Sequence, residues 1–500
     1  MLMAVKRCIV LFLGILLQFG FAIILRLYFE SHIFLISILY KIISVFIVLK
    51  IIKDSTRLSN DVPWIILILL FPIFGTILLI TLGKSYLKSK LLRNIFKYEK
   101  YYNNYFIQDE KIMKRINKEN IDELKYLINT SKFISYENSE ITYYDYGEKF
   151  YPELLHELKC AQKYIFMEYF IINNGVMWDG ILNILKEKAQ NGVDVRVIYD
   201  DMGSVACLDK NYPKTLEKYN IKCLTFNKLS SFNGIFLNNR DHRKMTIIDG
   251  KVAFSGGVNI SDEYINKVQK HGIWKDNAVK VKGEAVYNFV IMFLTIYSAL
   301  TLKKEDPLKY KYEEKNTSSD GLICPFGVSP LKKDLVGEDA YINLINNAKK
   351  HLYIMTPYLI IDNDLLNSLI RASKRGVDVR IIVPGIPDKK IVYTQTSSFF
   401  KVLVENNIKI YKFSKGFVHS KVLLSDDISS IVGTINLDYR SLYLHFENGI
   451  YLYKNSEIKK IRNDFDNTFE ECKLVTKKDV KTSLIKNIYE AILRLFAPLF

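Results

Sequence analysis

The chain has 500 residues, 49% of them hydrophobic, and carries a net charge of +17. This length is too great for one ordinary domain, so we expect two or more. The positive charge indicates an anionic partner, and nucleic acid and anionic lipid both qualify on charge alone. The six cysteines are scattered without a Cys-x-x-Cys pair. This pattern argues against a metal-thiolate site and is typical of reduced thiols facing the cytosol.

Three apolar runs precede the rest of the chain, at Cys8–Leu25, Ile33–Ile52 and Val62–Leu82. A helix needs roughly 20 apolar residues to cross a hydrocarbon core. The first and third runs meet this length without an internal charge. The second contains Lys41, which would cost about 3 kcal/mol at the bilayer centre. The number of crossings, two or three, therefore stays open.

Basic residues on both sides of the apolar runs indicate the orientation in a membrane. Lys6 and Arg7 precede the first run, as in a signal peptide, but no small-residue cleavage site follows Leu25, which favours an uncleaved anchor. By the positive-inside rule we expect a multi-pass protein of the cell membrane with cytoplasmic catalytic domains. Two crossings would satisfy both ends, and three would not. The basic residues after the third run, which would also attract anionic headgroups, are Lys84, Lys88, Lys90, Arg93, Lys97 and Lys100.

The remainder of the chain contains an internal repeat. Gly192–Ile198 recurs as Gly376–Ile382. Each copy is preceded by a segment with helical spacing of apolar residues, and before that by an apolar strand, Tyr164–Phe170 in the first copy and Leu352–Met355 in the second. The order of strand, helix and strand predicts an α/β fold in both halves, each with a mixed sheet flanked by helices.

A short motif occurs once in each half. It consists of a histidine, a lysine two residues later, an aspartate five residues after that, and an asparagine beyond a glycine turn, 17 residues from the histidine. One such pattern could arise by chance, but two complete copies are hard to dismiss. The two sets are His242, Lys244, Asp249 and Asn259, and His419, Lys421, Asp426 and Asn436.

These residue types suit phosphoryl transfer. In a strand, residues two apart share a face, so each histidine points the same way as its lysine. Lys244 and Lys421 supply charge for a phosphodiester, and Asn259 and Asn436 supply amide donors. A neutral imidazole could attack phosphorus while a protonated one releases the alcohol, through a covalent phosphohistidine. This chemistry needs no metal, and we expect no cofactor.

A histidine that moves protons usually has an orienting acid. The candidates are Asp276, in the segment Trp274–Asp276, and Glu447, in the segment His445–Glu447. From spacing alone, both residues also fit an ordinary surface charge.

The doubled motif resembles that of the phospholipase D superfamily, and the chain is most similar to the bacterial cardiolipin synthase family. The resemblance extends over nearly the whole chain. It rests on the doubled motif and on the segments Asn239–Lys244, Trp274–Asp276, Thr356–Tyr358, Asn436–Ser441, Pro63–Ile65 and Phe71–Gly75. It implies two phospholipase D-like repeats related by a pseudo-twofold axis. It also implies transfer of a phosphatidyl group from one phosphatidylglycerol to another at a membrane, which gives cardiolipin and glycerol.

The resemblance also implies roles for single residues. His242 would be the nucleophile and His419 the acid, while Asp276 and Glu447 would orient them. Other positions would act as phosphate ligands or as supporting members of the catalytic motif. The phosphate ligands would be Lys244, Lys421, Asn259 and Asn436, and the supporting members Asp249 and Asp426.

Two positions depart from the family pattern and one matches without an evident role. His445 stands where the family commonly has asparagine, and Tyr297 where it commonly has tryptophan. Glu168 stands where the family has a glutamate near the site, and the sequence gives it no function.

The predicted organisation has six parts. The last of these carries apolar residues on one helical face, which suits equally a helix packed on the core and one lying at a membrane interface. The parts are a membrane anchor (1–83), a basic connector (84–130), a first phospholipase D-like domain (131–302), a linker (303–335), a second such domain (336–480) and an amphipathic helix (481–500).

Three alternatives to the transferase remain at this point. A membrane-bound phospholipase D would use water as acceptor, and the motif does not distinguish it from a transferase. A nuclease of the same superfamily suits the net charge, but the membrane anchor argues against it, so we expect no nucleic-acid partner. A catalytically silent scaffold disagrees with two intact motifs.

Overall fold

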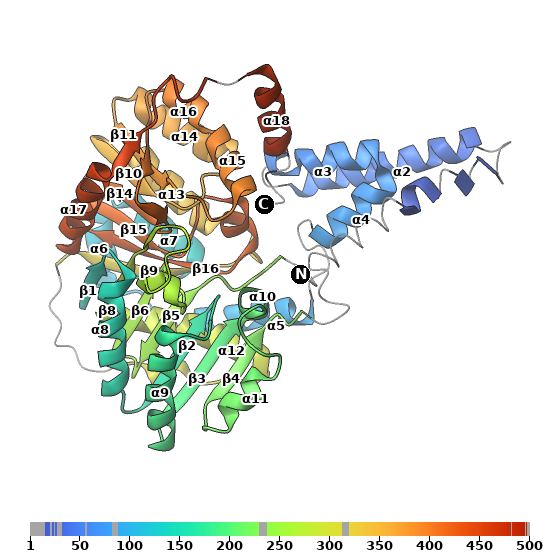
Figure 1. The fold of residues 1–500 in the computed structure, drawn as a ribbon. Helices are drawn as coiled ribbons and strands as arrows, with labels where there is room; N and C mark the ends of the chain where they lie inside the picture. Colours follow the sequence, from blue (N-terminus) through green and yellow to red (C-terminus); the bar gives the residue numbers. More distant parts are fainter. Residues whose placement is uncertain are drawn as a thin grey trace. The chain divides into compact units, whose positions relative to one another are not determined.

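The computed structural model describes residues 16–20, 23, 24, 26, 27, 33–55, 58–82, 89–229, 238–312, 320–481, 483–495 and 497. The chain forms two compact units. One contains Met1–Lys88, Leu229–Asn238 and Ile488–Phe500, and the other contains Ser89–Lys228 and Asn239–Asn487. Both copies of the repeat and both motifs belong to the second unit (Figure 1).

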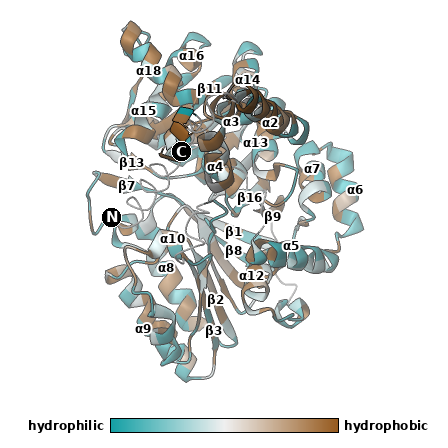
Figure 2. Cartoon of the chain, turned by 90° about the vertical axis from the view of Figure 1, so that its right-hand side faces the viewer, coloured by the Kyte–Doolittle hydropathy of each residue, from teal (hydrophilic) through white to brown (hydrophobic). Residues whose placement is uncertain are grey.

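The N-terminal unit contains the helices α2 (Ile33–Asp54), α3 (Leu58–Leu70) and α4 (Pro72–Leu82), all strongly apolar (Figure 2). Within the described ranges, only α2 is long and apolar enough to cross a membrane. Most of the first predicted run, Cys8–Leu25, lies outside the described residues. The three helices share a small apolar core of Val48, Ile51, Trp64, Ile68, Leu78 and Leu79.

The third predicted run, Val62–Leu82, is not one continuous span. It breaks between Leu70 and Pro72, because proline lacks the N–H that continues a helix and its ring crowds the preceding turn. Helix α4 folds back so closely that a Cβ on Gly75 would lie 2.7 Å from the carbonyl carbon of Leu67. The third run is therefore two short helices, and the number of membrane crossings stays a prediction.

The second unit is built on two large mixed sheets, whose central strands are buried and rich in β-branched and aromatic residues. The first contains β1 (Ser139–Tyr144), β2 (Tyr164–Tyr169), β3 (Asp194–Asp200), β4 (Lys222–Phe226), β5 (Lys244–Ile248), β6 (Val252–Gly256) and β8 (Ala278–Gly283). The second contains β9 (Leu322–Val328), β10 (His351–Met355), β11 (Asp378–Pro384), β12 (Lys409–Phe413), β14 (Val422–Ser425), β15 (Ser429–Gly433), β16 (Glu447–Tyr453) and β17 (Cys472–Leu474).

The two sheets have the same strand order. The first runs β1-β8-β6-β5-β2-β3-β4, and the second runs β9-β16-β15-β14-β10-β11-β12 with β17 added at the edge. In both, the equivalents of β2, β3 and β4 pair in parallel and the other neighbours are antiparallel. This shared topology confirms the predicted pair of mixed α/β repeats. Strand β9 lies within the segment assigned above to the linker.

Helices cover the sheets, and two of them pack against both repeats. Nearly every residue of α12 is buried, and this helix packs against β5 of the first sheet and β9 of the second. Helix α17 packs against β14 of its own sheet and against β1 of the other. The helices are α5 (Lys90–Tyr102), α6 (Glu110–Glu119), α7 (Asp122–Ser131), α8 (Gly147–Cys160), α9 (Val176–Gln190), α10 (Asp201–Ser204), α11 (Tyr212–Glu217), α12 (Val286–Thr301), α13 (Val336–Asn347), α14 (Asn363–Lys374), α15 (Lys390–Ser398), α16 (Phe400–Glu405) and α17 (Glu457–Glu470).

A small third sheet joins the repeats. Strand β7 (Ile273–Lys275) pairs in parallel with β13 (Gly416–Val418), which directly precedes His419. An isolated bridge between Asp241 and Phe446 makes the equivalent connection beside His242. The two motif histidines are therefore positioned by backbone pairing between the repeats.

The C-terminal helix α18 (Leu484–Leu495) has no buried residue. Its apolar face is exposed, with Ile485 at 81% and Ile488 at 54% relative exposure. The end of the predicted amphipathic segment, at Phe496 and residues 498–500, lies outside the described residues.

Candidate active site

The strands β5 and β14 carry the chemistry at their starts. Lys244 is the first residue of β5, and His242 lies two residues before it. Lys421 directly precedes β14, and His419 lies two residues before Lys421. The backbone N–H of His242 donates to the carbonyl oxygen of Phe446 at 2.9 Å, and that of His419 donates to the carbonyl oxygen of Lys275 at 2.7 Å. Each histidine is thus fixed by a segment of the other repeat.

The side chains of the histidines are paired across the repeats as well. Nδ1 of His242 lies 2.8 Å from Oε1 of Glu447. Nδ1 of His419 lies 2.6 Å from Oδ2 of Asp276. An imidazole whose Nδ1–H donates to a carboxylate keeps Nε2 free as an acceptor or nucleophile. Glu447 and Asp276 each contact the histidine of the opposite repeat, at the nitrogen where an orienting acid would lie.

Glu447 is completely buried, and the hydroxyl of Thr434 donates to its second oxygen, Oε2, at 2.5 Å. Burial raises the pKa of the Glu447 carboxyl to about 8, although the nearby Lys244 charge opposes this. Sequence reasoning missed Thr434. The available signal was its position in the glycine turn that follows the motif.

The two motif lysines are also buried. Nζ of Lys244 donates to the carbonyl oxygen of His242 at 2.6 Å, and Nζ of Lys421 makes the equivalent bond to His419. Burial lowers the pKa of Lys244 to about 7 and that of Lys421 to about 8, against the pull of nearby carboxylates. A bound phosphate anion would favour the protonated form of both amines.

Burial also lowers the pKa of both histidines. The pKa of His242 falls well below the ordinary value, and the charges of Lys244, Lys421 and His419 lower it further. Burial and the Lys421 charge lower the pKa of His419 to about 4, and Asp276 opposes part of this effect. Burial and the neighbouring cations therefore favour the neutral form of His242.

The motif asparagines are buried beside the histidines but differ in their contacts. Nδ2 of Asn259 donates to the hydroxyl of Tyr264 at 2.7 Å, and its Oδ1 accepts from the backbone of Ile171 at 3.1 Å. Oδ1 of Asn436 has no hydrogen-bond partner among the described residues. Asn259 is thus engaged by protein groups, whereas Asn436 keeps an unused polar atom.

The two motif aspartates accept hydrogen bonds from backbone N–H groups. Asp249 accepts hydrogen bonds from the backbone N–H groups of Gln162, Lys163 and Tyr164 at 2.7 to 2.8 Å. Asp426 does the same for Lys349, Lys350 and His351. Both residues follow the far ends of β5 and β14, where they anchor the start of the neighbouring strand.

Two further asparagines help to assemble the site. The backbone N–H of Lys421 donates to Oδ1 of Asn277 at 3.0 Å. Nδ2 of Asn448 donates to the hydroxyl of Ser255 at 2.7 Å. Both contacts join one repeat to the other. The signal for them was present in the sequence, because each asparagine directly follows an orienting acid.

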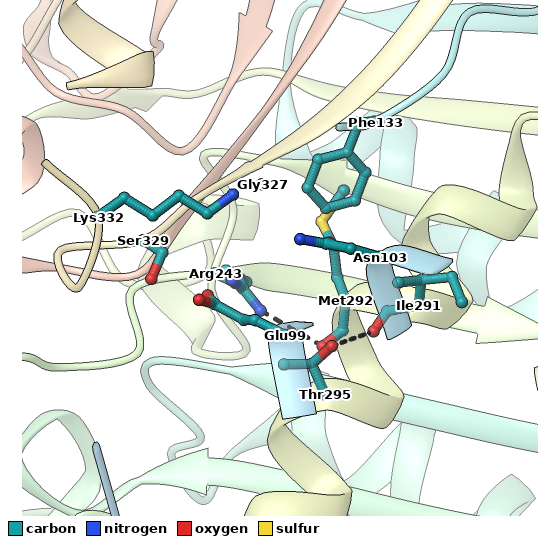
Figure 3. Close-up of a pocket in the computed structure, with 10 residues that line it drawn as sticks. All are labelled: Glu99, Asn103, Phe133, Arg243, Ile291, Met292, Thr295, Gly327, Ser329 and Lys332. Atoms are coloured by element: carbon teal, nitrogen blue, oxygen red, sulfur yellow. Dashed lines mark hydrogen bonds between the residues drawn. The ribbon is translucent and has the colours of Figure 1, made fainter. Parts of the chain in front are cut away.

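Nε of Arg243 donates to the carbonyl oxygen of Glu447 at 3.3 Å. Its Nη1 lies 3.4 Å from Oε1 of Glu168 and 3.5 Å from the carbonyl oxygen of Met292. Glu168, which had no role in the sequence, therefore contacts this buried arginine, while burial and the Asp241 charge raise the pKa of its carboxyl well above the ordinary value. A cavity of about 20 Å³ lies beside Arg243, between α5, α12 and β9 (Figure 3). It holds about one water molecule and is too small for a lipid.

A third histidine lies beside the first. The ring centroids of His445 and His242 are 5.7 Å apart, and Nδ1 of His445 is 3.9 Å from Oε1 of Glu447. Burial lowers the pKa of His445 well below its ordinary value. Neither ring nitrogen of His445 has a hydrogen-bond partner in the described part of the chain.

The chain matches the family model described as "Cardiolipin synthase, PLD-like domain" at residues 154–289 and 341–469. The two matched segments contain the two copies of the motif, and together they cover more than half of the chain.

Similar proteins match over most of the length. An uncharacterized protein of Streptococcus mutans serotype c is 40% identical over 90% of this chain and 99% of its own. A cardiolipin synthase of Alkalihalophilus pseudofirmus is 31% identical over 93% of each chain. The crystal structure of a phosphatidylserine synthase from Haemophilus influenzae is similar in fold, with a TM-score of 0.55 and 14% identity over 76% of this chain and 100% of that one.

Proposed function

The chain belongs to the cardiolipin synthases of the phospholipase D superfamily, and on that premise we propose that it transfers a phosphatidyl group from one phosphatidylglycerol to another. The products would be cardiolipin and glycerol. The observation that supports this proposal best is the crossed pairing of His242 with Glu447 and of His419 with Asp276. Through this pairing each repeat holds one oriented imidazole, and both imidazoles lie where the two repeats meet.

In the first half-reaction, Nε2 of His242 attacks the phosphorus of phosphatidylglycerol. The bond from phosphorus to the glycerol oxygen breaks, and His419 in its protonated form gives that oxygen its proton. Glycerol leaves, and the phosphatidyl group remains bound to His242 through a P–N bond. Glu447 stabilises the positive charge that develops on the His242 ring.

In the second half-reaction, a hydroxyl of a second phosphatidylglycerol attacks the same phosphorus. His419, now neutral, accepts the hydroxyl proton, and the P–N bond to His242 breaks. Cardiolipin forms, and both histidines return to their starting states. Lys244 and Lys421 stabilise the negative charge on the phosphate oxygens in both steps.

The neighbours of the two histidines support this division of roles. The nucleophile must be neutral, and burial together with the neighbouring cations lowers the pKa of His242. The acid must hold a proton, which the Asp276 carboxylate favours on His419. The negative charge of a bound phosphodiester would raise the pKa of His419 toward the working range.

Membrane attachment completes the proposal. Helix α2 has the length and composition of a membrane span, and the exposed apolar face of α18 suits an interface. Basic residues of α5, including Arg93 and Lys97, follow the apolar helices, which supports a cytoplasmic site under the positive-inside rule. In this arrangement the enzyme draws both lipid substrates from one leaflet.

The test uses purified protein in vesicles of phosphatidylglycerol, with lipids and glycerol measured by mass spectrometry. We expect cardiolipin and glycerol in equal amounts from the wild type and neither from His242→Ala. His351→Ala is the matched control, since His351 is paired with Asp427 outside the site. Phosphatidic acid with glycerol, and no cardiolipin, would overturn transfer in favour of hydrolysis.

A further inference from the structure

Three buried side chains, His242, His445 and Glu447, meet at one side of the active site. Each offers one possible metal-binding atom, and these atoms all lie within 4.8 Å of one another. None of the three side chains is more than 9% exposed. The group has the composition of two imidazoles and one carboxylate, which is a donor set that zinc uses with a fourth position left open.

His445 is the unexplained member of this group. A buried polar atom without a partner is destabilising, so the two unpaired ring nitrogens of His445 require a reason. The proposed transfer uses neither of them.

Local backbone structure holds His445 in this position. A π-helical turn, η6 (Arg440–Leu444), directly precedes it, and the N–H of His445 closes the turn on the carbonyl oxygen of Arg440 at 2.9 Å. Such turns are rare and frequent at functional sites. The turn brings the imidazole to 3.9 Å from Glu447.

We propose that these three residues bind a divalent transition-metal ion of the zinc type, and that the bound ion inhibits the transferase. The inhibition, but not the binding, rests on the proposed function. The ion would take Nδ1 of His242, a carboxylate oxygen of Glu447 and a ring nitrogen of His445. Water would fill the fourth position.

Inhibition follows from the chemistry of the His242 ring. Nδ1 of His242 faces Glu447, so the ion would occupy this nitrogen and displace the hydrogen bond between the two residues. A neutral imidazole carries one proton on its two nitrogens. Metal on Nδ1 therefore leaves the proton on Nε2, and Nε2 then has no lone pair with which to attack phosphorus. The ion also removes Glu447 as the orienting acid.

A second pair on the surface could take up zinc independently and must be separated from this site. On α8, Sγ of Cys160 lies 4.0 Å from Nε2 of His156, and Cys160 is exposed. This pair contains a thiol, whereas the proposed site contains none. Cobalt distinguishes the two, because only a thiolate ligand gives a sulfur-to-cobalt charge-transfer band in the near ultraviolet.

The first measurement is binding to the detergent-purified full chain, by dialysis against buffered free zinc with metal analysis. We expect one zinc per chain in the wild type, and an affinity at least about tenfold weaker in His445→Gln. His156→Gln and His351→Gln should bind as the wild type does. Unchanged affinity in His445→Gln, with loss in His156→Gln, would overturn the site.

A spectrum of the wild type keeps the test valid even where a variant folds poorly. The cobalt form should show visible bands of a four-coordinate ion without the sulfur-to-cobalt band. A sulfur band of full intensity, or an octahedral spectrum, would contradict the proposal.

The second measurement is the initial rate of lipid transfer against free zinc. The zinc concentration that halves the wild-type rate should match the dissociation constant for zinc, and zinc bound at His445 without inhibition would overturn the inhibitory role.

The proposed function and the proposed metal site fail separately. A chain that binds zinc through His445 but makes no cardiolipin contradicts only the function. If the wild type makes cardiolipin but His445→Gln binds zinc as tightly as the wild type does, only the metal site is contradicted.

Discussion

Glu447 in the second repeat orients His242 in the first, with 2.8 Å between Oε1 and Nδ1. Asp276 of the first repeat does the same for His419 of the second. Neither repeat therefore contains a complete pair of imidazole and carboxylate. The site exists only when the two halves are packed together, and the residues that pack them are part of the catalytic apparatus.

Glu447→Gln should lower kcat by about 10²–10⁴-fold with little change in KM, because the amide no longer selects the Nδ1–H tautomer or stabilises the charged ring. Asp276→Asn should do the same through His419. The rates are measured in phosphatidylglycerol vesicles. Glu123→Gln is the matched control, since Glu123 is a buried carboxyl on α7 outside the site. A wild-type kcat in both site variants would contradict the crossed pairing.

Asp249→Asn should lower the free energy of unfolding by about 1–3 kcal/mol, because it weakens three hydrogen bonds from backbone N–H groups at the start of β2. Asparagine tolerates the positive φ of 53° at this position, so backbone strain does not contribute. The kcat of the folded enzyme should stay near the wild-type value. Denaturant titration and kinetics on the same preparation check this, and a large loss of kcat at full stability would show that Asp249 acts in catalysis instead.

The apparent KM for phosphatidylglycerol should rise as the pH increases above about 8. The pKa of Lys244 is lowered to about 7 and that of Lys421 to about 8, so their charges are present below these values and lost above them. A bound anion favours the charged forms, and substrate binding therefore weakens as the amines deprotonate. Lys421→Arg keeps its charge and should flatten the rise. A KM independent of pH between 7 and 10 in the wild type would show that these amines do not bind the phosphate.

Arg240→Met should destabilise the protein by about 3–5 kcal/mol, because it leaves Asp200 buried without its partner. In the wild type, Nε of Arg240 lies 3.0 Å from Oδ1 of Asp200, and both side chains are fully buried. Burial already raises the pKa of Asp200 to about 6. The Arg240 charge lowers the pKa of Asp200, so its loss should raise that pKa further. The variant then loses more stability than the wild type as pH rises above about 6, and the defect should be larger at pH 8 than at pH 5. Thermal unfolding at the two pH values measures this, and an equal loss at both would contradict it.

The repeats and the motif could be predicted from the sequence because their signals are local. Apolar strands such as Tyr164–Phe170 recur with the same following helix, and the spacing of His242 and Lys244 places both side chains on one face of a strand. The break at Pro72 was also a local signal, and the length of the apolar run concealed it.

The rest of the site depends on contacts between distant residues. His242 and Glu447 are 205 positions apart, so no periodicity indicates which acid serves which histidine. Asp249 lies close in sequence to the motif histidine, but a five-residue strand carries it to the far end of β5. The contact of His445 with Glu447 depends on a π-helical turn, for which residue propensities give no signal.

The central claim is that His242 and His419 act on one phosphorus atom, as nucleophile and acid. A phosphatidyl ester of p-nitrophenol tests it, because this leaving group departs without an acid. We predict that His419→Asn releases a burst of nitrophenol equal to the amount of enzyme and retains a phosphatidyl adduct on His242, found by mass spectrometry. His242→Asn should give no burst. A burst that persists in His242→Asn, or an adduct on His419, would contradict the account.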